Sequence, residues 1–350
     1  MDVTILGIET SCDETSAAVV RNGREILSNV VFSQIEDHSA FGGVVPEVAS
    51  RRHLETIIPV VGEAFKQAGI SPGDICAVSA TYGPGLVGAL LVGLSFAKGL
   101  ARALGVPFIG VHHVAAHILA ASLMGDQSPA PPFTALVASG GHSSIYFADD
   151  YRSFRLVGMT RDDAAGEAFD KVARATGLGY PGGPKLEAAA RGGNTGFIRF
   201  PRTSFKDGTY DFSFSGVKTA AINYLKKMAQ DGGMDAQNNN AICASENNMR
   251  DFYASYQDAI VDALAANTLA AEREHGSGKI VVAGGVAANG ALRERLYGIQ
   301  EAGGGALRVF FPPPRLCTDN AAMVAARAYH DYAAGAFSPL TLNASASAPI

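Results

Sequence analysis

Two histidines four residues apart are the first candidates for chemistry. His113 and His117 bound the segment HVAAH, which follows an apolar run at residues 106–111. Because an α-helix turns about 100° per residue, the two side chains would project from one helix face, about 40° apart. Two imidazoles placed in this way supply two ligands of a metal site and need a third from elsewhere. Helix-capping or core histidines bonded to the backbone are the alternative.

A carboxylate near the other end of the chain could be that third ligand. Asp319 lies in the segment CTDN at residues 317–320, before a predicted helix. A helix N-cap would explain Thr318 or Asp319, because a side-chain oxygen there accepts backbone N–H bonds. With His113 and His117, however, Asp319 would complete a two-histidine, one-carboxylate site with open positions. Such a site suits iron or zinc acting as a Lewis acid.

Three turns of small residues could bind phosphate. They are Thr10-Ser11, Ser139-Gly140-Gly141 and the segment GGVAAN at residues 284–289. Each follows a predicted strand, where backbone N–H groups can face phosphate oxygens. Their corresponding places in a duplicated fold predict a nucleotide in a cleft between two lobes.

A fourth glycine turn has a different explanation. The segment GPGLVG at residues 83–88 matches GxGxxG, but the next strand ends in His112 and His113 instead of the acid that would bind a ribose hydroxyl. Close packing of helix on strand explains these glycines better. The sequence contains no GxxxxGK[ST] motif.

The elements that must position these residues are repeated. Residues 3–8, 16–21 and 25–32 read as three strands joined by short turns, and residues 134–157 follow the same plan. Each copy precedes helices and further strands, which predicts a duplicated α/β architecture; a chance likeness of two hairpins is the alternative. The other predicted strands are 76–80, 106–111, 279–283 and 306–311, and the other predicted helices include 46–67, 163–176, 252–275, 290–302 and 320–334.

The chain is long enough for two lobes. Its 350 residues exceed what one core usually needs, and Ala130-Pro131-Pro132 reads as a passage between lobes. We expect a first lobe at 1–130 with the histidine helix and a second at 131–336 with two of the turns. Residues 337–350, the C-terminal tail, are small and polar enough to be flexible. Residues 231–248 are rich in Gly and Asn and read as a mobile surface insertion.

The charge distribution limits how nucleic acid could bind. The net charge of −5 argues against electrostatic capture over the whole surface. Residues 185–227, however, contain eight Lys and Arg against Glu187, Asp207 and Asp211, a local excess of +5. A solvated face is the usual explanation, yet this segment is the best landing place for an anionic polymer.

Other features favour a cytoplasmic setting. Four cysteines without a CxxC pair favour a reduced protein, and the first residues show no basic leader of a signal peptide. The uncharged stretch 75–97 is long enough for a membrane span. It is interrupted by Tyr82-Gly83-Pro84-Gly85, so we expect a buried strand, a turn and a buried helix.

Taken in order, the motifs resemble one known family. IETSCDET at 8–15, HVAAH at 113–117 and SGGH at 139–142 are similar to the bacterial TsaD (Gcp/YgjD) family of tRNA adenosine threonylcarbamoyltransferases. Further matching segments are GGVVPE at 42–47, GPGL at 83–86, DAAGEAFDK at 163–171, DFSFSG at 211–216, AGGV at 283–286 and CTDN at 317–320. The likeness runs from about residue 3 to 335.

The resemblance implies a fold, a reaction and two binding sites. The fold would be a duplicated actin-like (ASKHA) α/β fold with two lobes and a central cleft. The threonylcarbamoyl group of threonylcarbamoyl-adenylate would pass to the exocyclic amine of the adenosine beside the anticodon, in tRNAs reading codons that begin with A. By family position, one iron ion, or zinc, would bind His113, His117 and Asp319. The adenylate would bind Val137, Ala138, Ser139, Gly140, Gly141, Asp170, Gly183 and Asn289.

The resemblance also implies partners: tRNA, a subunit of similar fold, an ATPase subunit and a separate enzyme that makes the adenylate. Asp13 and Glu14 are our candidates to orient or deprotonate the amine, with a solvated hairpin turn as the alternative. Ala138 replaces the Val or Ser of many relatives, and the insertion near Asn238 lengthens a loop; neither departure affects the assignment.

Three other functions fit parts of the sequence. A metallopeptidase would need a Glu base after His113, where the chain has Val114. A small-molecule kinase fits the duplicated fold, but phosphoryl transfer to a hydroxyl needs no histidine pair. A nucleotide-binding scaffold without chemistry is the third.

Overall fold

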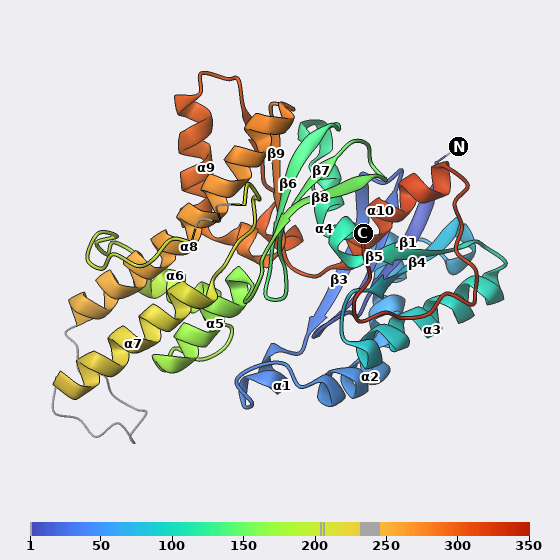
Figure 1. The fold of residues 1–350 in the computed structure, drawn as a ribbon. Helices are drawn as coiled ribbons and strands as arrows, with labels where there is room; N and C mark the ends of the chain where they lie inside the picture. The colour runs from blue at the N-terminus through green and yellow to red at the C-terminus, as the bar shows by residue number, and fades with distance from the viewer. Residues whose placement is uncertain (1, 204, 206, 232–245) are drawn as a thin grey trace. The chain divides into compact units, whose positions relative to one another are not determined.

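The computed structural model describes residues 2–203, 205, 207–231 and 246–350 (Figure 1). Most of the predicted insertion at 231–248 therefore lies outside the described residues. By its internal contacts the chain divides into two units. Unit 1 comprises Met1–Pro132, Ala148–Arg155 and Phe310–Ile350, and unit 2 comprises Phe133–Phe147 and Leu156–Val309.

Unit 1 contains a five-stranded sheet in the order β3-β2-β1-β4-β5. β1 pairs antiparallel with β2, which pairs antiparallel with β3, whereas β4 and β5 run parallel to β1. The strands are β1 Thr4–Glu9, β2 Glu14–Arg21, β3 Glu25–Ser33, β4 Ala77–Gly83 and β5 Phe108–His112. The first three are the predicted meander, and the last two are the predicted strands that follow it.

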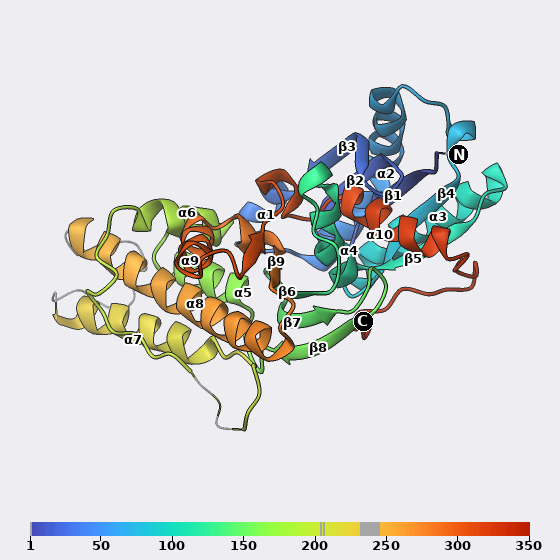
Figure 2. The same cartoon turned by 90° about the horizontal axis from the view of Figure 1, so that it is seen from above.

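Helices cover both faces of this sheet (Figures 1 and 2). Side chains alternate along β1, so that Leu6 and Ile8 pack with α2 and α3, while Ile5 packs with α10 on the other face. Gly7 faces α10, where an added Cβ would lie 2.9 Å from the backbone nitrogen of Ala325. The helices are α1 Ile35–Ser39, α2 Pro46–Ala68, α3 Val87–Leu104, α4 His113–Leu119 and α10 Ala321–Ala333.

The last helix belongs to unit 1, although the sequence placed it in the second lobe. Its alanines and Met323 form one core with Ile5, Val20 and Ile109. Small side chains along α10 let the helix lie close on the sheet. Unit 1 is therefore built from both ends of the chain.

Unit 2 repeats the strand order of unit 1. Its sheet runs β10-β9-β6-β7-β8, which is again a three-strand meander followed by two further strands on the side of its first strand. β6 and β9 are parallel, with Val137 opposite Ala283, so both strands end at the same edge. The strands are β6 Phe133–Ala138, β7 Ser143–Ala148, β8 Phe154–Met159, β9 Lys279–Ala283 and β10 Arg308–Phe310. The predicted duplication is confirmed.

The helices of unit 2 follow the predicted pattern with one exception. α7 and α8 lie side by side in both views (Figures 1 and 2). The exception is α6, which begins inside Tyr180-Pro181-Gly182-Gly183-Pro184, a segment whose prolines and glycines predict a tight loop. Gly182 and Pro184 occupy its first turn, where proline is tolerated. The helices are α5 Ala165–Ala175, α6 Gly182–Ala190, α7 Ser215–Asp231, α8 Glu246–His275 and α9 Gly290–Ala302.

Among the described helices, α3 is long and apolar enough to cross a membrane by length and composition alone. In the structure it packs one face on the sheet through residues such as Leu90, Leu94 and Ala97. The stretch 75–97 is thus the strand, turn and helix that we expected.

The C-terminal tail lies along unit 1. The Ser338 N–H donates to the carbonyl of Phe108 (2.9 Å), and the Gly110 N–H donates to Oγ of Ser338 (2.9 Å). Farther along, Nε2 of His112 lies 2.9 Å from the carbonyl oxygen of Ala348. The tail therefore satisfies polar groups of β5, the strand that leads into the histidine helix.

Candidate metal centre and phosphate-binding turns

Three side chains from unit 1 converge as the sequence suggested. One ligand atom each of His113, His117 and Asp319 lies within 4.8 Å of the others. Oδ1 of Asp319 is 3.0 Å from Nε2 of His117 and 3.6 Å from Nε2 of His113. Both histidines are buried, and Asp319 is partly exposed.

Local structure explains this convergence. β5 ends at His112 and α4 begins at His113, so the two histidines share one face of a short helix. Asp319 precedes α10, whose N-cap is Asn320: Oδ1 of Asn320 accepts the Met323 N–H at 3.2 Å. The cap that the sequence offered as an alternative role for Asp319 is therefore supplied by its neighbour.

The donor set fits a divalent transition metal. Two imidazoles and one carboxylate leave coordination positions open, which suits iron or zinc better than calcium or magnesium. The sequence identified this set because the helical spacing of the histidines is visible without a structure.

A fourth group at this centre escaped the sequence reasoning. Glu9, the last residue of β1, is fully buried, and its Oε2 lies 3.1 Å from Nδ1 of His113. Burial disfavours the charged forms of both Glu9 and His113. The attraction to His113 nevertheless lowers the pKa of Glu9. Burial lowers the pKa of His113, but the negative charges of Asp319 and Glu9 outweigh this effect and raise the pKa to about 9. The signal in the sequence was an apolar strand that ends in a carboxylate.

The turn after β1 carries Asp13 and Glu14. Burial, followed by the charges of Asp13 and Asp319, raises the pKa of Glu14 to about 10, so its carboxyl group is protonated at neutral pH. Burial also raises the pKa of the Cys12 thiol, which leaves no thiolate nucleophile at this residue. Asp13 is buried as well, so this turn is not the solvated hairpin turn that the sequence offered as an alternative.

Neighbouring helices hold this turn in place. Oγ1 of Thr10 donates to the carbonyl of Ala89 in α3 (2.9 Å), and Nε2 of His53 in α2 lies 2.9 Å from the carbonyl oxygen of Cys12. A Cβ on Gly85 would lie 2.6 Å from the carbonyl oxygen of Ser11. The glycines of GPGLVG thus serve close packing, as we expected.

In unit 2 the predicted adenylate residues gather where β6 and β9 end. The side chains of Val137 and Ala138 are fully buried, so only their backbone is available to a ligand. Ser139 bends the chain: its Oγ accepts the His142 N–H at 3.1 Å. Gly140 and Gly141 are exposed, and an added Cβ on either would meet no atom within 4 Å.

Contacts tie the remaining predicted residues to this edge. The Gly166 N–H at the start of α5 donates to the carbonyl of Ser139 (3.1 Å). Farther along α5, Oδ1 of Asp170 accepts the Gly182 N–H at 2.7 Å, next to Gly183.

The turn after β9 completes the group. A Cβ on Gly284, whose φ is 86°, would lie 2.8 Å from the carbonyl carbon of Ala138, so only glycine fits there. Asn289 caps α9 by accepting the Leu292 N–H at 3.0 Å, and its Nδ2 donates to Oε1 of Gln257 (3.0 Å). The structure thus groups the metal candidates within unit 1 and the adenylate candidates within unit 2.

In the structure, carboxylates from other parts of the chain neutralise some of the positive charge of the basic segment 185–227. Arg202 pairs with Asp258 (2.6 Å) and Asp262 (2.7 Å), and Lys218 pairs with Asp163. These carboxylates lie outside the window that we counted. The exposed cations of the segment that remain for a polyanion are Lys185, Arg191, Arg199, Lys226 and Lys227, whereas Lys206 lies outside the described residues.

The chain is similar to known proteins along almost its whole length. The sequence model of one family, described as TsaD: tRNA N6-adenosine threonylcarbamoyltransferase, matches residues 25–326. A tRNA N6-adenosine threonylcarbamoyltransferase from Clostridium perfringens (strain ATCC 13124) is 53% identical over 340 residues, 97% of this chain and 96% of its own. Another, from Clostridium botulinum (strain 657), is 53% identical over 342 residues, 98% and 96% of the two chains.

Solved structures show the fold. Full-length HypF in its phosphate- and nucleotide-bound form aligns with a TM-score of 0.60 at 15% identity, over 96% of this chain and 56% of that chain. Component A of the (R)-2-hydroxyglutaryl-CoA dehydratase of Acidaminococcus fermentans aligns with a TM-score of 0.51 at 16% identity, over 95% and 99%. These likenesses bear on the fold alone, and they confirm the predicted duplicated actin-like α/β class.

Proposed function

The chain belongs to the tRNA N6-adenosine threonylcarbamoyltransferase family and is therefore a transferase that modifies adenosine in tRNA; from this premise we propose how its residues carry the reaction. The donor is threonylcarbamoyl-adenylate, and the acceptor is the exocyclic amine of the adenosine beside the anticodon, in tRNAs reading codons that begin with A. A carbon–nitrogen bond forms at the carbamoyl carbon, its bond to the phosphate oxygen breaks, and AMP leaves as the amine loses a proton.

His113, His117 and Asp319 hold one divalent metal ion, iron with zinc as the alternative. The convergence of two imidazoles and one carboxylate within 4.8 Å is the observation that carries this proposal. A Lewis-acidic ion held there would polarise the carbamoyl carbonyl. The three side chains also orient the reacting end of the donor, because they come from two rigid helix starts.

Residues at the edge of the second sheet bind the adenylate. Gly140 and Gly141 leave room beside their backbone, so that their exposed peptide groups can face a phosphate. Val137 and Ala138 contribute backbone only. Ser139, Asp170, Gly183 and Asn289 complete the proposed set.

Asp13 accepts the proton of the amine, and Glu14 supports it. The pKa of Glu14 is raised to about 10, so this carboxyl can donate a hydrogen bond but is a poor base at neutral pH.

A single-turnover assay with purified adenylate and unmodified tRNA tests the metal assignment. The double substitution His113→Ala with Asp319→Ala should abolish both bound metal, measured by elemental analysis, and the modified nucleoside, measured by mass spectrometry. His275→Gln, at the end of α8 in unit 2, is the matched control and should retain both. Full activity in a metal-free double variant would overturn the proposal.

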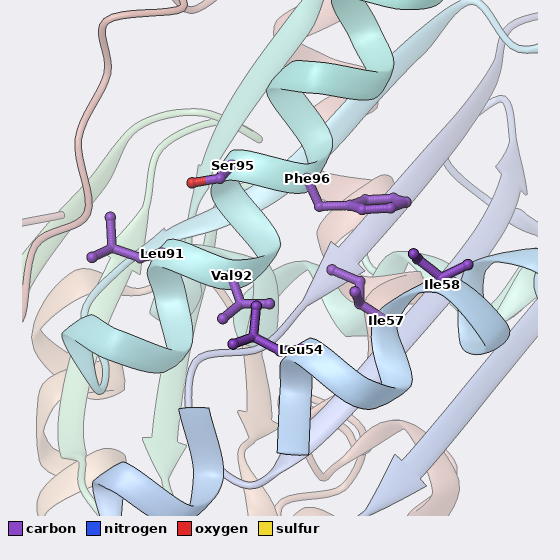
Figure 3. A pocket seen from close by; sticks show the side chains of 7 residues that line it. All are labelled: Leu54, Ile57, Ile58, Leu91, Val92, Ser95 and Phe96. Carbon is purple, nitrogen blue, oxygen red and sulfur yellow. The ribbon is translucent and has the colours of Figure 1, made fainter. Parts of the chain in front are cut away.

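A partner subunit of similar fold binds unit 1 through an apolar groove between α2 and α3. The groove has a volume of about 440 Å³. Figure 3 shows its lining: Leu54, Ile57, Ile58, Leu91, Val92, Ser95 and Phe96. Leu54 and Ile58 are 65% and 69% exposed, and apolar side chains gathered in this way mark interaction surfaces. We propose an ATPase subunit as a further partner and a separate enzyme as the source of the adenylate. We also propose a cytoplasmic location.

A further inference from the structure

We propose that Glu9 is a positioning residue for the metal centre. Its carboxylate holds the proton of His113 on Nδ1, which leaves the lone pair of Nε2 directed toward Asp319 and available to a metal ion. The inference rests on the proposed function in one respect, namely that His113 is a ligand.

Two hydrogen-bond donors besides His113 contact the Glu9 carboxylate. Oε1 accepts the Ser11 N–H at 2.7 Å, and Oε2 accepts the Thr81 hydroxyl at 2.7 Å. Oε2 also lies 3.1 Å from Nδ1 of His113. An ionised carboxylate can only accept, so Nδ1 of His113 must carry a hydrogen.

The other face of the same imidazole points toward the proposed ion. Nε2 of His113 lies 3.6 Å from Oδ1 of Asp319. With the hydrogen fixed on Nδ1, a neutral ring presents its lone pair at Nε2. A carboxylate behind a histidine ligand fixes ring orientation and tautomer in many metal sites.

The two histidines differ in this support. Nδ1 of His117 is buried and has no hydrogen-bond partner among the described residues. Apart from the contact of its Nε2 with Asp319 (3.0 Å), His117 is therefore oriented by packing within α4, where Ala116 and Ile118 are also buried. His113 is the ligand whose orientation depends on a specific polar contact.

The substitution Glu9→Gln separates positioning from simple packing. The amide keeps the size of the side chain and still offers one oxygen to the Ser11 N–H. Its NH2 group then faces His113 and donates to Nδ1. The ring must carry its hydrogen on Nε2 instead, which blocks the lone pair needed by the metal.

Two measurements test this on the full-length protein. The first is the dissociation constant for Zn2+, obtained by competition with a chromophoric chelator. The second is the position of the His113 proton in metal-free protein, obtained from ¹⁵N chemical shifts at a pH where the imidazole is neutral. Glu9→Gln should weaken Zn2+ binding by about 10–100-fold and move the proton from Nδ1 to Nε2.

Glu272→Gln is the matched control, because Glu272 is a buried carboxylate of unit 2 that also accepts a hydroxyl and a backbone N–H, from Ser277 and Gly278. This control should change neither measurement.

Unchanged Zn2+ affinity in Glu9→Gln, or a proton on Nε2 in the original protein, would overturn the inference. The second result needs no variant and so remains available if Glu9→Gln does not fold. A protein that binds no metal but carries the proton on Nδ1 would refute the proposed metal site alone.

Discussion

At the scale of residues, the proposed proton chemistry involves two adjacent carboxyl groups, Asp13 and Glu14. Glu14 remains protonated at neutral pH, as its raised pKa indicates, and glutamine imitates a protonated glutamic acid. We therefore expect Glu14→Gln to retain activity within a few-fold, whereas Asp13→Asn should lower kcat by about 10²–10⁴-fold through loss of the base. Single-turnover rates measure both.

Metal content is the control for this pair of variants, and both should keep the ion. Equal losses in the two variants would show that Glu14, and not Asp13 alone, takes part in proton transfer.

The sequence located the metal candidates but not their support. His113 and His117 are visible through helical spacing, and Asp319 as a carboxylate beside a predicted helix start and through family likeness. Glu9 contacts Thr81 and His113, which lie 72 and 104 residues farther along the chain. These contacts depend on the parallel register that sets Ile8 opposite Ala80, and no local pattern encodes that register.

At the scale of elements, the C-terminal tail offers a test of unit 1. It bonds to Phe108 and Gly110 of β5, and a Cβ on Gly110 would overlap the side chain of Leu342. Removing residues 337–350 should expose these groups and lower the free energy of unfolding by about 1–3 kcal/mol, measured by urea denaturation.

Gly110→Ala, which displaces Leu342 without shortening the chain, should have a smaller effect of the same sign. Unchanged stability of the truncated chain would favour the flexible tail that its composition suggests.

Regular elements were predictable where periodicity was strong. The structure begins and ends α9 and β9 at the predicted residues, because a clear apolar pattern is bounded by glycine turns and the Asn289 cap. α6 was missed because Tyr180-Pro181-Gly182-Gly183-Pro184 reads as a loop. The charge excess of 185–227 was overestimated because Asp163, which precedes α5, and Asp258 of α8 pair with cations of this segment.

At the scale of the whole molecule, the apolar groove between α2 and α3 predicts that unit 1 binds a partner subunit. Leu54→Glu with Ile58→Glu places two charges on the exposed apolar face, so the partner subunit of similar fold should no longer co-elute on size exclusion. Leu156→Glu is the matched control. Leu156 lies on β8 in unit 2 and is 47% exposed, so this substitution should leave binding intact.

The thermal midpoint and metal content should be unchanged in the groove variant. Persistent co-elution would place the partner elsewhere, and loss of self-association alone would assign the groove to a second copy of this chain.

The discontinuity of unit 1 has a consequence for synthesis. His117 and Asp319 are 202 positions apart, and α10 completes the core beneath β1. A ribosome must therefore translate residue 319 before the three proposed ligands can come together, whereas most of unit 2 lies in one continuous stretch that emerges earlier. A nascent polypeptide stalled upstream of Asp319 would lack one of the three proposed metal ligands.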